Sequence, residues 1–283
     1  MERECFLTVL IALIGGIALL ACGWWPPAET SAESARCLEH VVWRRIWWTF
    51  VPALTVAAWL CGWALVEPDP VPEKVPVAVL IAAVPFLLLF TRAAIRAGWS
   101  LLRDDGDPGT ATVGLLKPWI VFSPHLAKAL DDRAIAAALE HERAHARHRD
   151  PLRIWLAQIV TDLQWPWPQA RDRFRAWIVA LELARDEEAR AAGADGSDLA
   201  SAILAAARLR QHAIASPVAA LIGEQSVLKQ RIARLLNPLT DQAEEVRARW
   251  PQPLILAPVL LIAVVLGSAF GEIVVRTLLR IAA

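Results

Sequence analysis

The sequence carries no net charge and little cysteine, and both features narrow the functions open to it. Its 29 Lys and Arg are balanced by 29 Asp and Glu, and no basic stripe appears along the chain. Direct binding of nucleic acid is therefore not expected, because it depends on an excess of positive charge on one surface. The four cysteines form no CxxC pair and none lies within 98–249: Cys5, Cys22, Cys37 and Cys61. They are poor candidates for metal ligands.

Charged residues are also missing from four long runs, at 5–28, 46–66, 75–91 and 250–271. Each run is long enough, or nearly so, to cross a hydrocarbon core of about 30 Å as a helix. We predict spans at about 5–25, 46–66 and 75–95, and a fourth span with a short external tail within 250–283. The first run could instead be a signal peptide, but the acidic Glu2 and Glu4 favour a span. Tyrosine is absent whereas Trp occurs 14 times, which suits anchoring by indoles at the membrane interface.

Basic residues beside the spans predict one orientation. They follow the third run and precede the fourth, so residues 98–249 are expected on the cytoplasmic side: Arg92, Arg96, Arg103, Arg247 and Arg249. The acidic loop at 67–74 and both termini are expected outside, where Arg276 and Arg280 are the one discordant feature. The sequence thus predicts a multi-pass protein of the inner (cytoplasmic) membrane. Residues 1–97 would supply three spans.

Residues 98–249 have the polarity and size of one water-facing domain. After a turn-rich loop at 103–109, residues 110–123 have the composition of two short strands around Lys117 and Pro118. The remainder is expected to be helical. The predicted fold is therefore mainly α, with four transmembrane helices and one helical domain that carries a short β-hairpin or edge strands.

Within this domain, the expected helix at 133–149 contains the pattern HExxH. His141 and His145 are four residues apart, so their imidazoles lie on one face and can form half of a tetrahedral zinc site. Glu142, beside them, can accept a proton from a water on the metal. Asp131 or Asp132 is expected to cap this helix, and Asp150-Pro151 to end it.

A zinc site of this kind needs a third protein ligand and a carboxylate that orients a ligand histidine through its other ring nitrogen. On a later helix, at 171–192, Glu182 and Asp186 share a face and can fill these two roles. His148 lies a turn beyond His145 and is expected at the surface or in an interface. His212 could stabilise a tetrahedral intermediate, or be bonded locally. The predicted strands are either a structural hairpin or an edge that pairs with an extended peptide.

The order of these motifs resembles that of the M56 metallopeptidases, the BlaR/MecR-type membrane peptidases. The resemblance spans 110–239 and includes the segments at 113–121, 141–152, 165–168, 182–186 and 231–236. It implies a zincin-like cytoplasmic domain between the third and fourth spans, with zinc on His141, His145 and Glu182 and with Glu142 as the base. Antibiotic-sensing members carry an external penicillin-binding domain after the fourth span. This chain ends at Ala283, so we expect no such sensor domain.

The predicted function is an integral-membrane zinc endopeptidase that cleaves a cytoplasmic or membrane-proximal protein in a signalling pathway. Its partners would be membrane lipid and a protein or peptide substrate, which could be a transcriptional repressor or the chain itself. Two alternatives remain open from the sequence. One is a general quality-control or processing protease of the membrane, and the other is a signalling component that binds a partner without hydrolysis.

Overall fold

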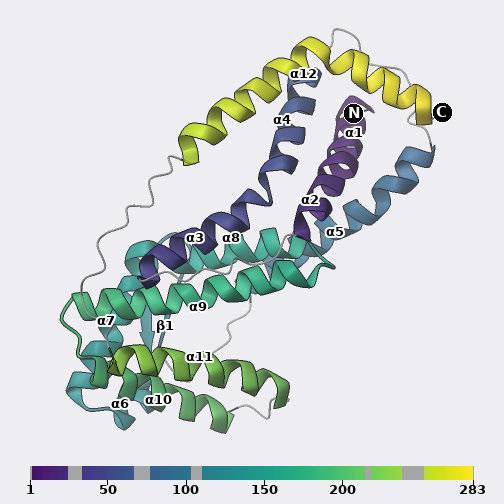
Figure 1. Ribbon diagram of the computed structural model, residues 1–283. Helices are drawn as coiled ribbons and strands as arrows, with labels where there is room; N and C mark the ends of the chain where they lie inside the picture. The colour runs from purple at the N-terminus through teal and green to yellow at the C-terminus, as the bar shows by residue number, and fades with distance from the viewer. Residues whose placement is uncertain are drawn as a thin grey trace.

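The computed structural model describes residues 2–24, 34–66, 77–102, 110–213, 218–237 and 252–282, and this part of the chain is mainly helical, as predicted. In chain order the elements are α1 (Glu2–Leu10), the π-helical turn η1 (Ile11–Gly15), α2 (Gly16–Gly23), α3 (Ala35–Trp48), α4 (Val51–Val66), α5 (Val77–Leu102), β1 (Thr110–Val113), β2 (Trp119–Phe122), α6 (Pro124–Ala129), α7 (Asp132–His148), α8 (Asp150–Leu163), α9 (Pro168–Ala191), α10 (Gly196–Ala213), α11 (Val218–Leu236) and α12 (Gln252–Ala282). Apolar helices form one end of the molecule, and the sheet with α7, α10 and α11 forms the other (Figure 1).

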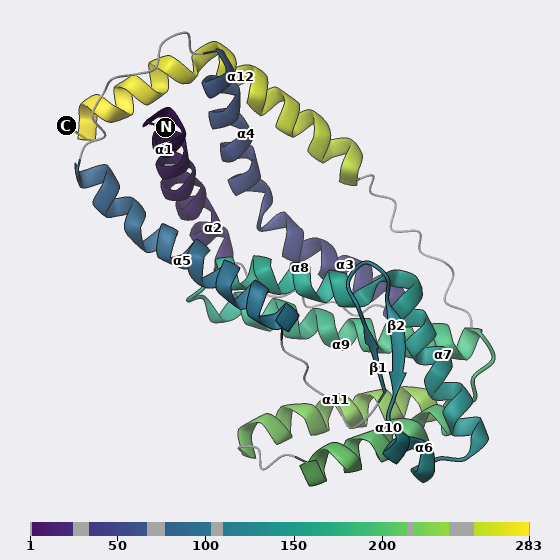
Figure 2. The same cartoon turned by 180° about the vertical axis from the view of Figure 1, so that it is seen from behind.

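Three helical segments are long and apolar enough to cross a membrane: Phe6–Gly23, Val77–Leu101 and Leu256–Thr277. They coincide with the first, third and fourth predicted spans and are candidates to cross a membrane. The N-terminus, the end of α4, the start of α5 and the C-terminus lie at the same end of the molecule, whereas α2 and α5 finish near α8 and α9 (Figures 1 and 2). Successive spans therefore alternate in direction, as a multi-pass membrane protein requires.

The second predicted span, 46–66, differs from the structure. The run is divided between α3 and α4, whose axes differ by 41°, and the pair counts as one span only if it is a bent one. At the bend, Thr49 donates its hydroxyl hydrogen to the carbonyl of Ile46 and accepts a hydrogen bond from Gln164. The 16 residues of α4 are about 24 Å long, less than the hydrocarbon core.

Helix α3 packs on the helices beyond the third span rather than on the other spans. Val42 and Ile46 of α3 are buried in a cluster with residues of α8 and α9: Ala157, Val160, Trp177 and Leu181. This contact also buries Ala157 and Val160 of α8 in a protein core. Ile46 is buried in this protein core. The uncharged run at 46–66 therefore begins in a protein core and continues into the apolar helix α4.

The local signals around the HExxH helix are confirmed. Thr110 pairs with Phe122 and Val113 with Trp119 in an antiparallel hairpin, which turns at Gly114 with φ +93°. The Ser123 side chain caps α6 at the amide of His125, and the Asp131 side chain caps α7 at the amide of Ala134. Each cap satisfies an amide that has no partner inside its helix.

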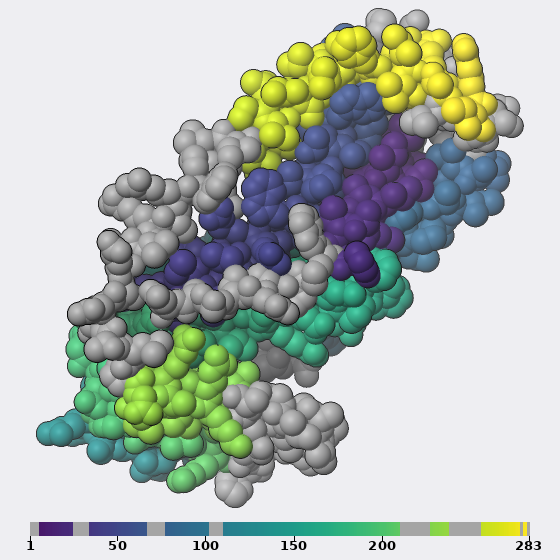
Figure 3. Space-filling model, viewed as in Figure 1, coloured from purple at the N-terminus to yellow at the C-terminus, as the bar shows by residue number. Residues whose placement is uncertain are grey.

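Helix α12 lies along α4 with glycines at the points of closest approach, and Figure 3 shows α12 covering the far end of α4. A Cβ atom added at Gly62 would overlap the backbone of Val264, and one added at Gly267 would overlap the carbonyl oxygen of Trp59. Gly271, four residues later, meets the side chain of Trp63. Small residues at this spacing allow helices in a membrane to approach closely.

We predict that Gly267→Ala lowers the thermal stability of the protein in detergent, because overpacking costs about 1–3 kcal/mol. Gly98→Ala on α5 is the matched control, since an added Cβ there meets nothing within 4 Å. It should leave the unfolding temperature unchanged or raise it slightly. Equal unfolding temperatures for the two variants would contradict the close contact between α4 and α12.

Candidate metal centre

Helices α7 and α9 bring together the three residues that the sequence predicted as metal ligands. The Nε2 atoms of His141 and His145 are 3.0 Å apart. An oxygen of Glu182 lies 3.5 Å from Nε2 of His141, and the other lies 3.6 Å from Nε2 of His145. All three side chains thus point at one position, and together they could hold a metal ion.

These distances match the dimensions of a tetrahedral metal site. With metal–ligand bonds of about 2.0–2.1 Å, the edges of such a tetrahedron are about 3.3–3.4 Å long. The distance between the two Nε2 atoms and the distance from each of them to its nearer Glu182 oxygen range from 3.0 to 3.6 Å. The Glu182 side chain is 26% exposed, so the group of three ligands is not closed off from solvent. A fourth position can therefore be taken by water or by substrate.

Asp186 faces the second ring nitrogen of His141, as predicted from its spacing to Glu182. Its Oδ1 lies 3.0 Å from Nδ1 of His141, although the contact is too bent for a good hydrogen bond. Arg231 of α11 donates two hydrogen bonds of 2.8 Å to Asp186 and lies 2.7 Å from Glu182. One guanidinium group thus fixes both carboxylates of α9.

Asp150 plays the matching role for His145, and the sequence reasoning missed it. Its Oδ2 lies 2.9 Å from Nδ1 of His145, and the side chain is 0% exposed. Arg185 donates two hydrogen bonds to the same carboxylate. Arg149 makes this possible, because its left-handed conformation (φ 52°) ends α7 and directs Asp150 back towards the histidine.

The charges around the ligands shift their pKa values. Burial alone would lower the pKa of His141, but Asp186 and Glu182 outweigh it and raise the pKa to about 9. Burial alone would raise the pKa of Glu182, but Arg231 and the two histidines hold it well below its usual value. The pKa of Asp150 is likewise lowered, because His145 and Arg185 outweigh its burial. These carboxylates are ionised at neutral pH and available to a cation.

Glu142, the predicted base, is buried next to the two histidines and is held by the sheet. Thr112 of β1 lies with its hydroxyl oxygen 2.7 Å from a carboxylate oxygen of Glu142, and 2.9 Å from its backbone carbonyl. Since the hydroxyl has one hydrogen, it can donate to either oxygen at a time. The β-hairpin therefore positions this carboxylate, a role that no feature of the sequence indicated.

The remaining histidines stand apart from this centre or lie beyond what the structure describes. His148 is 47% exposed and pairs with Glu188 at 2.9 Å, so it lies on the surface as expected. Helix α10 includes His212, but its side chain falls outside the described side chains.

We predict that Glu182→Gln lowers the metal content of the purified protein by at least tenfold, because it replaces a charged ligand by a neutral, weaker one. Asp172→Asn, an exposed carboxylate on the same helix, is the control and should keep the metal content of the wild type. Metal content can be measured by elemental analysis after dialysis. Full occupancy in Glu182→Gln would exclude Glu182 as a ligand.

Asp150→Asn should weaken metal binding about 10- to 100-fold, as is typical when the partner of a ligand histidine is replaced. The amide keeps the size of the side chain but leaves Arg185 without its full counter-charge. A competition assay with a chromophoric chelator would measure the affinity. An unchanged affinity would show that His145 is oriented without Asp150.

Comparison with known proteins identifies the part of the chain that contains this centre. Residues 108–235 match the family model described as BlaR1 peptidase M56. No curated protein and no solved structure matches the chain. The matched segment contains the HExxH helix, Glu182, Asp150, Asp186 and Arg231, which are the residues that the structure brings together. Residues 108–235 are therefore similar to the M56 metallopeptidases.

Proposed function

We propose that this protein is a zinc endopeptidase of the membrane. The observation that carries the proposal is the convergence of His141, His145 and Glu182 on one position, with the buried Glu142 on the same helix as the two histidines. Two imidazoles and one carboxylate in a tetrahedral arrangement, with one position left for water, form a donor set that zinc peptidases use. The family match supports the metallopeptidase activity.

The chain's own residues supply binding, orientation and proton transfer in this mechanism. A bound zinc ion would polarise the scissile carbonyl and make the attacking water more acidic. Glu142 takes the proton from that water and delivers it to the leaving amine. Thr112 keeps the Glu142 carboxylate in place, while Asp186 and Asp150 orient the imidazoles of His141 and His145.

The free edge of β1 is the proposed guide for the substrate. In the described part of the chain β1 pairs with β2 alone, and Thr112 of β1 contacts the catalytic Glu142. An extended peptide added along β1 would pass next to this carboxylate. Three exposed side chains of the hairpin are apolar, Leu116, Trp119 and Val121, and the exposed Lys117 lies at the turn. An apolar, extended segment of a protein is thus a suitable substrate.

We further propose that residues 98–249 form the catalytic domain and lie on the cytoplasmic side of the inner membrane. The basic residues beside α5 and before α12 support this orientation. The substrate would then be a cytoplasmic or membrane-proximal protein, such as a transcriptional repressor or the chain itself. The role in signalling is an inference from the M56 family, and a broader processing role is the alternative.

We predict that Glu142→Gln keeps the metal but loses at least 100-fold in cleavage rate, since general base catalysis contributes about 10²- to 10⁴-fold. Glu140→Gln is the matched control on the same helix, because Glu140 faces Arg143 and Arg147 instead of the ligands. The readout is the set of new protein N-termini in cells that express each variant. Cleavage by Glu142→Gln at the wild-type rate would refute the assigned base.

A further inference from the structure

A buried carboxylate outside the metal centre is connected to it by a continuous line of charged groups. Glu39 lies on α3, yet its side chain is only 3% exposed. It accepts a hydrogen bond from Arg153 of α8, and Arg153 donates through its other arm to Asp150, at 3.0 Å. Asp150 in turn contacts Nδ1 of His145, at 2.9 Å. Two residues therefore separate Glu39 from a metal ligand.

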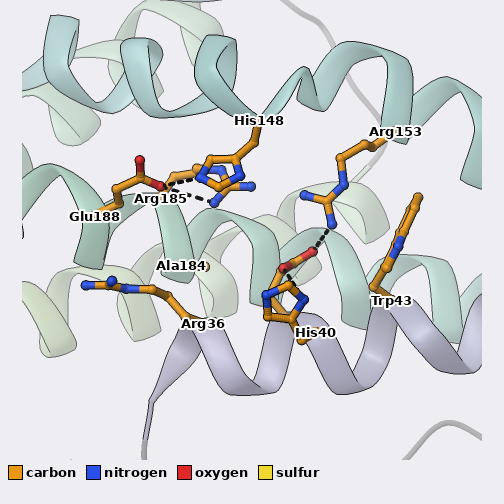
Figure 4. A pocket seen from close by; sticks show the side chains of 9 residues that line it. Arg36, His40, Trp43, His148, Arg153, Ala184, Arg185 and Glu188 are labelled. Carbon is orange, nitrogen blue, oxygen red and sulfur yellow. Dashed lines mark hydrogen bonds and ion pairs between the residues drawn. The ribbon is translucent and has the colours of Figure 1, made fainter. Parts of the chain in front are cut away.

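The position of Arg153 in this line is tightly defined. Its guanidinium group lies over the ring of Trp43, at 4.6 Å from the ring centre, and 5.6 Å from the centre of the Trp177 ring. Trp177 also donates its indole hydrogen to Glu39, at 2.9 Å. Figure 4 shows Arg153 beside Trp43, with its ion pair drawn. Held in this way, Arg153 can bridge Glu39 and Asp150 but has little room to move elsewhere.

The alternation of charged groups from Glu39 through Arg153 to Asp150 indicates a specific role for Glu39. Asp150 faces two guanidinium groups, those of Arg153 and Arg185, as well as His145. If both guanidinium charges acted on Asp150 alone, its carboxylate would attract the Nδ1 hydrogen of His145 less strongly. The negative charge of Glu39 compensates the positive charge of Arg153. The carboxylate of Asp150 therefore interacts mainly with Arg185 and His145.

We propose that Glu39 is a positioning residue for the metal centre, which acts through Arg153 and Asp150 to keep His145 oriented. This inference rests on the proposed role of His145 as a metal ligand. It gives α3 a part in the activity, although α3 precedes the HExxH helix by almost 100 residues. Helix α3 is followed directly by the apolar α4. A displacement of α4 that moved α3 would therefore change the contact between Glu39 and Arg153, and through Asp150 the orientation of His145.

Part of this line of charged groups also borders a cleft. Glu39, Arg153 and Trp43 line a cleft of about 490 Å³ between α3 and the catalytic helices, together with His40, His148 and Glu188. Figure 4 shows His40 and His148 on opposite sides of this cleft. A shift of α3 across it would change the contact between Glu39 and Arg153 before it disturbed the ligands themselves.

The test measures Co²⁺ binding by the full-length protein in detergent, with the visible absorption of the bound ion as a second readout. Glu39→Gln keeps the shape of the side chain and an oxygen for Trp177, but removes the charge. We expect it to weaken Co²⁺ binding about 3- to 10-fold, less than a change at Asp150 itself, and to shift the absorption bands. Glu187→Gln is the matched control, because Glu187 joins α9 to α3 through Ser34 and Ala35, away from Arg153.

A double variant separates a charge effect from a loss of packing. Glu39→Gln with Arg153→Met removes both charges, so its affinity should be closer to that of the wild type than the affinity of Glu39→Gln alone. Additive losses in the double variant, equal losses in Glu39→Gln and Glu187→Gln, or no loss in Glu39→Gln would each overturn the proposal. If Glu182→Gln still weakens Co²⁺ binding in those cases, the metal centre stands. If wild type and Glu182→Gln bind Co²⁺ equally, the metal centre itself is wrong, and the role of Glu39 with it.

Discussion

The metal centre depends on how two imidazoles are kept 3.0 Å apart with their donor atoms facing each other. Each ring is oriented from behind by a carboxylate, Asp186 for His141 and Asp150 for His145. Both carboxylates are buried, so each needs a counter-charge to be stable there. Arg185 of α9 provides it for Asp150 and Arg231 of α11 for Asp186, while Arg153 of α8 is shared between Asp150 and Glu39. The packing of these helices around α7 is therefore also the arrangement that makes the site possible.

The sequence predicted those parts of the site that follow from helical spacing. His141, Glu142 and His145 share one helix, and Glu182 and Asp186 share another, so periodicity alone shows which of them point the same way. Asp150 could not be found in this manner, because it follows a left-handed residue and belongs to the next helix. Arg231 is 45 residues from Asp186 along the chain, and that distance is closed by tertiary packing alone. Contacts of this kind have no local pattern in a single sequence.

The uncharged run at 46–66 shows a second limit of sequence reasoning. Hydropathy reports that a segment avoids water, but a membrane and a protein core satisfy that preference equally well. Ile46 is buried against Val160 and Trp177, while α4 packs against α12. The break at Thr49 lies between these two environments, and it is fixed by a hydrogen bond from Gln164 of α8. The partner of the break is remote in sequence, so the sequence did not indicate that the predicted span at 46–66 is divided between two helices at an angle of 41°.

The balance of charge explains why the centre is suited to a divalent cation. Around the ligands and the line to α3 there are five carboxylates, Glu39, Glu142, Asp150, Glu182 and Asp186, against the three guanidinium groups of Arg153, Arg185 and Arg231. With neutral histidines, these groups carry an excess of two negative charges, which one divalent ion would cancel. Burial alone would lower the pKa of His141, but Asp186 and Glu182 raise it to about 9. A proton and a metal ion would thus compete for one region of negative charge, and His141, His145 and Glu182 could hold a divalent ion there.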